Sequence, residues 1–112
     1  MRISAALPRR DMHFRRHGLG LRTLTVEEYD QLFQTHNTLQ DLRRFTFIRS
    51  ETADVRWHLI DPISGNVALY NESHQRYWSF FRNRNLPRLL DSVRGEWIGV
   101  FQYDGDWQYK PW

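Results

Sequence analysis

Two histidines and two charged neighbours have the chemistry that a metal-free ribonuclease needs. His58 and His74 could serve as the base for a 2′-hydroxyl and the acid for a leaving oxygen, because histidine titrates near neutral pH. Arg76 could stabilise the developing negative charge, with Glu72 nearby in sequence. Strand alternation places His58 on a polar face and His74 in a loop, so the two could converge, although the spacing does not require it. Solvated surface histidines are the alternative interpretation, and only His58 and His74 are candidate catalytic residues.

Other catalytic and metal chemistries have little support in the sequence. The chain has no cysteine, which excludes a disulfide scaffold, a thiolate metal site and a cysteine nucleophile. His13 and His17 are four residues apart, but they lack a third ligand near in sequence, and the arginines between them would repel a cation. No nucleophile elbow and no glycine-rich phosphate loop is present. We therefore expect neither a metal nor a cofactor, and a binding protein rather than an enzyme.

Positive charge is concentrated in two segments. Lys110 is the only lysine among 16 basic residues, so the rest are arginines. Residues 1–22 carry a net charge of +5 and residues 73–94 a net charge of +4, whereas residues 23–72 carry −4. A guanidinium group fits phosphate or carboxylate and stacks on rings. These segments suit nucleic acid or an acidic protein surface; a genome that favours arginine codons is the alternative explanation.

Aromatic residues alternate with arginines in the second basic segment. Stacking of bases on aromatic rings beside arginines that hold phosphates is typical of proteins that bind single strands and RNA loops. An aromatic core with a rim of arginines is the alternative. Trp112 ends the chain after a proline and is a candidate anchor for a partner or a homodimer contact. The candidate binding residues are Arg9, Arg10, Arg15, Arg16, Arg76, Tyr77, Trp78, Arg82, Arg84, Arg88 and Trp112.

The elements that would position these residues follow from periodicity and capping signals. Residues 25–28 form a capping box, which predicts a helix over 26–36 that continues, or is followed by a second helical piece, to about 43. From Phe45 the period changes to two, which predicts short strands through the middle of the chain. Residues 76–81 favour a strand, although their aromatic residues also fit one helix face.

The last third of the chain completes the expected fold. Residues 85–94 have the spacing of an amphipathic helix that Asn85 caps. Asp104-Gly105 predicts the turn of a C-terminal hairpin. The expected fold is α+β, with a small antiparallel sheet of about five or six strands and two helices packed on one face.

The length of 112 residues favours one domain. We expect residues 1–22 to be a basic arm or a short first strand, and residues 23–112 to be a single α+β domain. No apolar run is long enough to span a membrane and no signal-peptide core is present, so we expect a cytoplasmic protein without a membrane partner. Binding to RNA or DNA phosphates is the first functional hypothesis. Binding to another protein, as an inhibitor or adaptor of the kind found in phages and mobile elements, is the alternative, and a toxin-like ribonuclease is the third.

Overall fold

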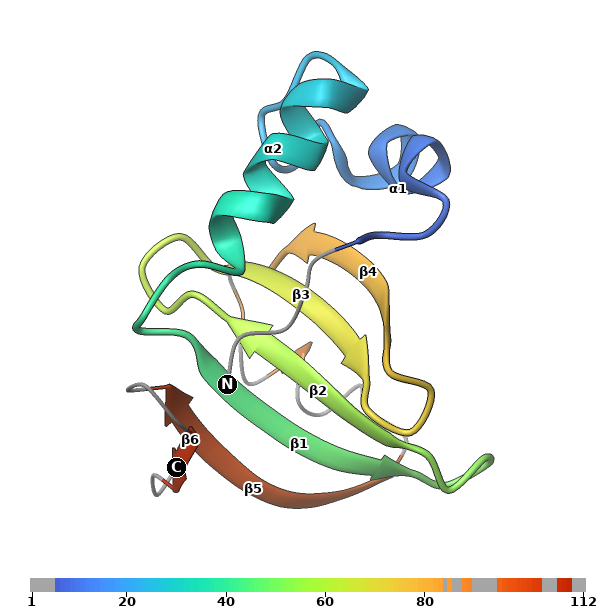
Figure 1. Ribbon diagram of the computed structural model, residues 1–112, viewed down its shortest axis with the longest axis vertical. Coiled ribbons are helices and arrows are strands. Elements are labelled where there is room, and N and C mark those ends of the chain that lie inside the picture. The colour runs from blue at the N-terminus through green and yellow to red at the C-terminus, as the bar shows by residue number, and fades with distance from the viewer. Residues whose placement is uncertain (1–5, 84, 86–87, 90–94, 104–106, 110–112) are drawn as a thin grey trace.

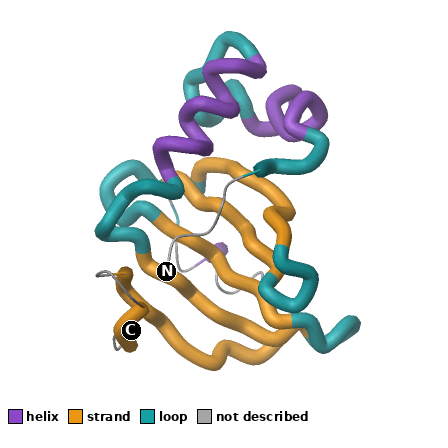
Figure 2. The backbone as a smooth tube through the Cα atoms, viewed as in Figure 1, coloured by secondary structure: helices purple, strands orange, loops and turns teal. Residues whose placement is uncertain are grey.

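The computed structural model describes residues 6–83, 85 and 88–89 with their side chains, and residues 95–103 and 107–109 by their backbone. The described strands pair antiparallel in one sheet, in the order β4-β3-β2-β1-β5-β6 (Figures 1 and 2). The α+β class with a small antiparallel sheet is therefore confirmed. In chain order the elements are α1 (Arg10–His17), α2 (Val26–His36), β1 (Arg43–Arg49), β2 (Val55–Ile60), β3 (Asn66–Asn71), β4 (Arg76–Arg82), β5 (Gly95–Tyr103) and β6 (Trp107–Tyr109).

The helix α2 spans the residues that the sequence predicts for it, 26–36. The Thr25 hydroxyl accepts a hydrogen bond from the Glu28 amide at 3.1 Å, and the Glu28 carboxylate accepts one from the Leu24 amide at 3.2 Å. Both ends of a capping box are thus occupied. The helix ends before Asn37, whose side chain donates to the Phe33 carbonyl at 2.7 Å. The expected continuation, or second helical piece, to about residue 43 is wrong, because turns lead from Asn37 to β1.

The first described residues belong to the folded body. Residues 10–17, which were expected in a basic arm or a first strand, form the helix α1. Leu7 and Leu21 flank this helix and are buried in the same cluster as Tyr29 of α2. The arm interpretation is wrong, and the sequence does not show this because Phe14 is the one apolar contact to the cluster from within α1, while Leu7 and Leu21 lie outside it and add no helical period.

Both helices lie at the same end of the sheet, next to β3 and β4 (Figure 1). The sheet face that they cover, here called the helix face, carries the main core. Phe33 is fully buried, with its ring 4.8 Å from that of Tyr77 and 5.3 Å from that of Phe80. The Tyr29 hydroxyl donates to the Phe80 carbonyl. The buried members of this cluster are Leu7, Leu21, Tyr29, Phe33, Leu42, Trp57, Leu59, Ala68, Tyr70, Tyr77 and Phe80.

The opposite face of the sheet, here called the second face, has its own smaller cluster. Phe45, Ile60 and Val67 pack there with Leu89. The Asn85 side chain accepts a hydrogen bond from the Arg88 amide at 3.2 Å, so Asn85 caps the turn that contains Arg88 and Leu89. The rest of the expected helix over 85–94 lies outside the described residues. Leu89 packs on the second face, whereas α2 lies on the helix face beside α1, so the expectation of the two predicted helices on one face is not met at Leu89.

The remaining strand predictions can be compared with the backbone. Residues 76–82 form strand β4, so the strand interpretation of this segment is confirmed over the helical one. β5 and β6 pair antiparallel, with Tyr103 opposite Trp107. The expected turn at residues 104–106 lies outside the described residues.

Candidate functional site

The helix α1 presents arginine side chains to solvent. Arg9, Arg10, Arg15 and Arg16 are all exposed. Arg10 forms an ion pair with Asp30 of α2 at 3.4 Å. In the part of the chain that the structure describes, the other three form no ion pair. The Arg15 Nε donates to the Asp11 carbonyl at 3.4 Å, a contact that leaves its charge uncompensated.

Two histidines of α1 have lowered pKa values, because they are partly buried and lie near arginines. The rings of His13 and His17 are stacked, with centroids 6.2 Å apart and planes at 13°. Burial lowers the pKa of His13, and the charges of Arg16 and Arg9 lower it further. Burial also lowers the pKa of His17, with His13 and Arg16 adding to the effect. Both imidazoles are therefore neutral at pH 7, and among the described residues no three His, Asp or Glu side chains gather as a metal ion would need.

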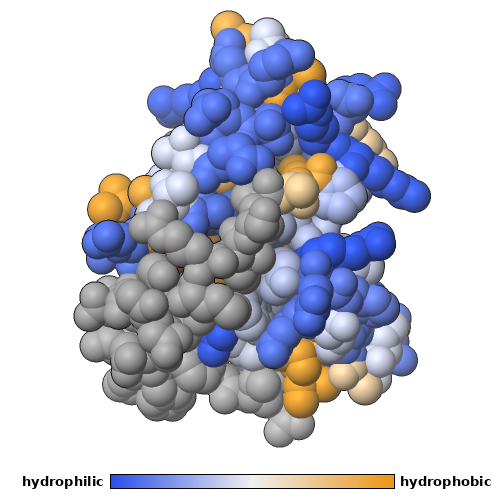
Figure 3. Space-filling view, in the orientation of Figure 1, coloured by the Kyte–Doolittle hydropathy of each residue, from blue (hydrophilic) through white to orange (hydrophobic). Residues whose placement is uncertain are grey.

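The loop between α1 and α2 exposes two large apolar side chains. Leu19 is 92% exposed and Leu24 is 84% exposed. The loop is held in place because Leu21 is buried and because the Thr23 hydroxyl and amide both donate to the Gly18 carbonyl at 3.0 Å. The space-filling view shows a mainly hydrophilic surface at this end of the molecule, interrupted by small apolar areas (Figure 3). Periodicity does not reveal these two leucines, because loop residues follow no period.

The two aromatic candidates of β4 have different environments. Tyr77 is 2% exposed on the helix face, and its hydroxyl donates to the Asn37 side chain at 2.8 Å. Its expected role as a stacking residue is therefore corrected: it belongs to the core. Trp78 is half-buried on the second face, where the guanidinium carbons of Arg56 and Arg76 each lie 5.0 Å from its ring centroid. The His74 ring lies 6.0 Å from the same ring.

The other predicted binding residues are spread over the molecule. Arg82 is half-buried and donates to the Ser64 carbonyl at 3.0 Å. Arg76 and Arg88 are exposed. Arg84 and Trp112 lie outside the described residues.

The structure corrects the expected place of His58. It is 5% exposed and its ring stacks on Phe47, with centroids 5.2 Å apart. The reason is that β2 is an inner strand whose residues are buried on both sheet faces. Burial, with a smaller effect of Arg56, lowers the pKa of His58 to about 4. His74 is exposed, so the structure does not bring the two histidines together as a pair that faces solvent.

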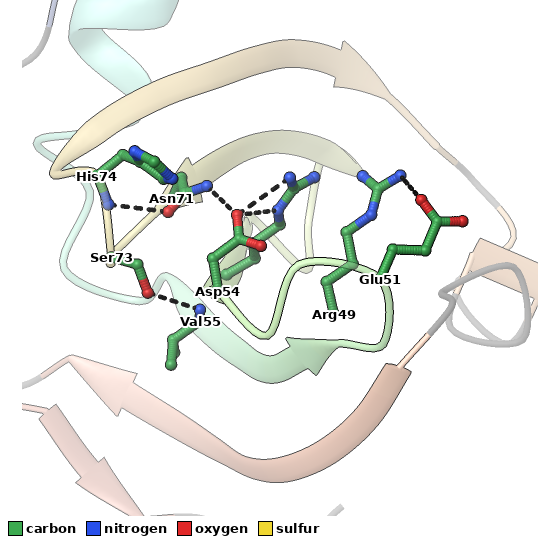
Figure 4. A network of polar contacts seen from close by, with 8 residues as sticks. Arg49, Glu51, Asp54, Val55, Asn71, Ser73 and His74 are labelled. Carbon is green, nitrogen blue, oxygen red and sulfur yellow. Dashed lines mark hydrogen bonds and ion pairs between the residues drawn. The ribbon is translucent and has the colours of Figure 1, made fainter.

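A buried polar network connects β2, β3 and the loop before β2, and the sequence analysis missed it. The Asp54 carboxylate accepts hydrogen bonds from the Arg56 Nε at 3.1 Å and from the Asn71 side chain, and the Arg56 Nη2 lies 3.1 Å away (Figure 4). The Arg56 and Asp54 side chains are 8% and 6% exposed. Although burial opposes it, hydrogen bonds from Asn71 and Arg56 hold the pKa of Asp54 below its usual value. The only sign of this network in the sequence is that Asp54 and Arg56, two residues apart at the start of β2, fall on the same face of the strand.

Comparisons with known proteins identify no relative. No protein-family model, curated protein or solved structure matches this chain. Within the described residues, no helix is both long and apolar enough to cross a membrane. The function therefore has to be inferred from the surfaces of the molecule.

Proposed function

We propose that this protein is a small binding protein that holds nucleic acid phosphates through the arginines of α1. One observation carries the proposal: Arg9, Arg15 and Arg16 are exposed on or next to a helix about 12 Å long, and none of them has an ion-pair partner among the described residues. A guanidinium group can donate two parallel hydrogen bonds to one phosphate. Several such contacts provide the electrostatic attraction that dominates nucleic acid binding.

The histidines of α1 support the same interpretation. The charges of Arg9 and Arg16 lower the pKa of His13, and Arg16 lowers that of His17. The positive charges therefore act on a common region of the surface. A bound phosphate would compensate them, so we expect binding to raise the pKa of both histidines.

The test is the affinity for a fluorescein-labelled 20-nucleotide single strand of mixed sequence, measured by fluorescence anisotropy at 50 mM salt. We expect the Arg15→Ala/Arg16→Ala variant to bind about tenfold more weakly, which corresponds to ~1.4 kcal/mol shared by two exposed ion pairs.

The matched control is the Arg43→Ala/Arg49→Ala variant, which removes the same charge from the two ends of β1. We expect its affinity to stay within about twofold of the wild type, because β1 is not part of the proposed surface. Equal weakening in both variants would show a diffuse charge effect and would contradict the proposal. Absence of binding by the wild type would contradict it as well.

A second candidate function is binding to an acidic protein, and the loop between the helices favours it. Leu19 and Leu24 are exposed on a loop that is fixed by internal hydrogen bonds, and Arg22 beside them is also exposed. Apolar anchors rimmed by arginine are common at protein interfaces. A complex that survives nuclease treatment and is lost in the Leu19→Ser/Leu24→Ser variant would support this function over the first.

A further inference from the structure

We infer that the nucleic acid is single-stranded where it passes β4, and that one unpaired base stacks on Trp78 while Arg76 holds an adjacent phosphate. The inference rests on the proposed function of α1, because α1 would supply most of the electrostatic attraction. It adds a substrate class, single strand rather than duplex, and a residue that distinguishes the two.

The Trp78 ring packs against a buried guanidinium that is itself hydrogen-bonded. The Arg56 guanidinium lies 5.0 Å from the ring centroid and is itself fixed by Asp54, whose carboxylate also accepts from Asn71. Figure 4 shows hydrogen bonds from two directions converging on the Asp54 carboxylate. A side chain that is already ordered loses little conformational entropy when it binds a ligand. The buried network thus makes Trp78 a preorganised platform.

An irregularity in β4 accompanies this platform. Opposite β3, Ser79 pairs with Leu69 and Tyr77 pairs with Tyr70, so Trp78 is the extra residue of a β-bulge. Bulges redirect side chains and are frequent next to functional sites. Here Tyr77 points into the core while Trp78 contacts Arg56 on the second face.

The exposed groups next to Trp78 are suited to a phosphate. Arg76 lies 5.0 Å from the ring centroid and is exposed, so its guanidinium can move from the ring to a phosphate when a base arrives. His74 is exposed beside the ring and can donate a further hydrogen bond. The carboxylate in the same turn, Glu72, is directed to the helix face, where it accepts a hydrogen bond from Trp57 at 2.8 Å.

The α1 helix and Trp78 lie along the same edge of the sheet. β4 is an edge strand, and α1 packs beside it (Figure 1). The His17 ring of α1 lies 5.7 Å from the Phe81 ring. Phe81 is three residues from Trp78, which is about 10 Å along a strand. A chain held by the arginines of α1 can therefore continue along β4 to Trp78.

Stacking on Trp78 requires an unpaired base. In a duplex the base faces are occupied by neighbouring base pairs, whereas a single strand can turn a base outward. Loss of one aromatic platform weakens single-strand binding roughly 5- to 150-fold and does not depend strongly on sequence. Duplex binding would use phosphates alone and would not depend on Trp78.

The experiment compares a labelled 12-nucleotide single strand with the duplex of the same sequence. We expect Trp78→Leu to weaken single-strand binding about tenfold and to leave duplex binding within twofold of the wild type. We expect Trp78→Phe, which keeps a stacking ring, to restore most of the single-strand affinity. Arg76→Ala, which leaves the ring in place, should weaken single-strand binding a few-fold; it also tests the site if Trp78→Leu fails to fold.

The outcomes separate the two proposals. If Arg15→Ala/Arg16→Ala weakens binding while Trp78→Leu and Arg76→Ala bind single strands like the wild type, α1 binds nucleic acid and the inference about Trp78 is wrong. Equal losses for single strand and duplex in Trp78→Leu would also overturn it. If the wild type binds neither probe, the proposed function of α1 fails first.

Discussion

The two helices lie side by side at one end of the sheet and differ in what they contribute. α2 fully buries Tyr29 and Phe33, nearly buries His36, and begins at a capping threonine. α1 buries only His13, begins at Arg9 without a side-chain cap, and exposes its other charged residues. Burial of aromatic area makes α2 a principal source of stability. The same comparison identifies α1 as the helix whose surface is available for binding.

The charges of α1 are placed so that they do not oppose the helix. Asp11 lies in the first turn, and Arg15, Arg16 and His17 lie in the last turn. Acidic residues near the N-terminus and basic residues near the C-terminus complement the helix dipole. An arginine-rich surface can thus be maintained on a short helix, while the neighbouring helix supplies the core contacts.

The largest expected difference between the helices is in core packing. We expect Phe33→Ala in α2 to lower the free energy of unfolding by about 3–5 kcal/mol, because the ring is fully buried. Phe14 of α1 is only partly buried, so Phe14→Ala should cost less than half as much. Urea unfolding monitored by circular dichroism measures both. Equal losses in the free energy of unfolding would contradict the claim that α2 supplies more of the core packing than α1.

Acid should destabilise the protein mainly through His58 of β2 rather than through the histidines of α1, whose pKa values are lowered less. The unfolded state takes up a proton at His58 near pH 6.5, whereas the folded state does so only near pH 4. Stability is therefore lost as pH falls through this window, by about 3 kcal/mol from His58 alone. His58→Leu should flatten the decline, and His17→Gln in α1 should flatten it less, because the pKa of His17 is lowered less. The free energy of unfolding is measured by urea unfolding at each pH. If it declines in His58→Leu as it does in the wild type, this assignment is refuted.

A close contact between the end of α1 and its own side chain gives a smaller effect. A methyl group added at Gly18 would lie 2.5 Å from a Phe14 ring carbon and 2.6 Å from the Phe14 carbonyl oxygen. We expect Gly18→Ala to destabilise the protein by about 2 kcal/mol, because the backbone atom cannot simply move away. Gly20→Ala is the matched control, since its added carbon would meet only the His17 carbonyl at 3.5 Å. Thermal unfolding in which both variants match the wild type would disprove the contact.

The smallest expected effect concerns the starts of the helices. Thr25→Ala removes the hydroxyl that accepts from Glu28, and we expect a loss of about 1 kcal/mol. Arg9→Ala should change stability by under about 0.5 kcal/mol, because the Arg9 side chain makes no capping hydrogen bond. A larger loss in Arg9→Ala than in Thr25→Ala, by the same unfolding assay, would reverse the assigned roles.

The contrast between the helices also explains what the sequence could predict. The capping box and the spacing of Tyr29 and Phe33 identify α2, because its buried residues are on the helix itself. α1 has no such period, since Leu7 and Leu21 on either side of it provide much of the contact with the core. Local patterns report contacts made by an element's own residues and miss an element that its neighbours hold in place.

The contacts on the second face of the sheet could not be predicted from the sequence either, because they are made between different strands. Alternation placed His58 on a solvated face, but that face has its own apolar cluster around Phe45 and Ile60. The support of Trp78 by Arg56 depends on the pairing of three strands and on a bulge in β4. Register and bulges are set by tertiary packing, so the aromatic and arginine content could be recognised while their arrangement could not.

The salt dependence of single-strand binding tests the central claim about α1 most directly. The affinity of the wild type for the labelled 20-nucleotide strand would be measured between 50 and 200 mM salt, beside Arg15→Ala/Arg16→Ala and Trp78→Leu. We predict that the slope of log affinity against log salt becomes shallower by about 1.4 in the arginine variant, because two phosphate contacts are lost. Trp78→Leu should bind more weakly with an unchanged slope. A wild-type slope in Arg15→Ala/Arg16→Ala, or an affinity that does not depend on salt, would contradict the claim that α1 holds nucleic acid phosphates.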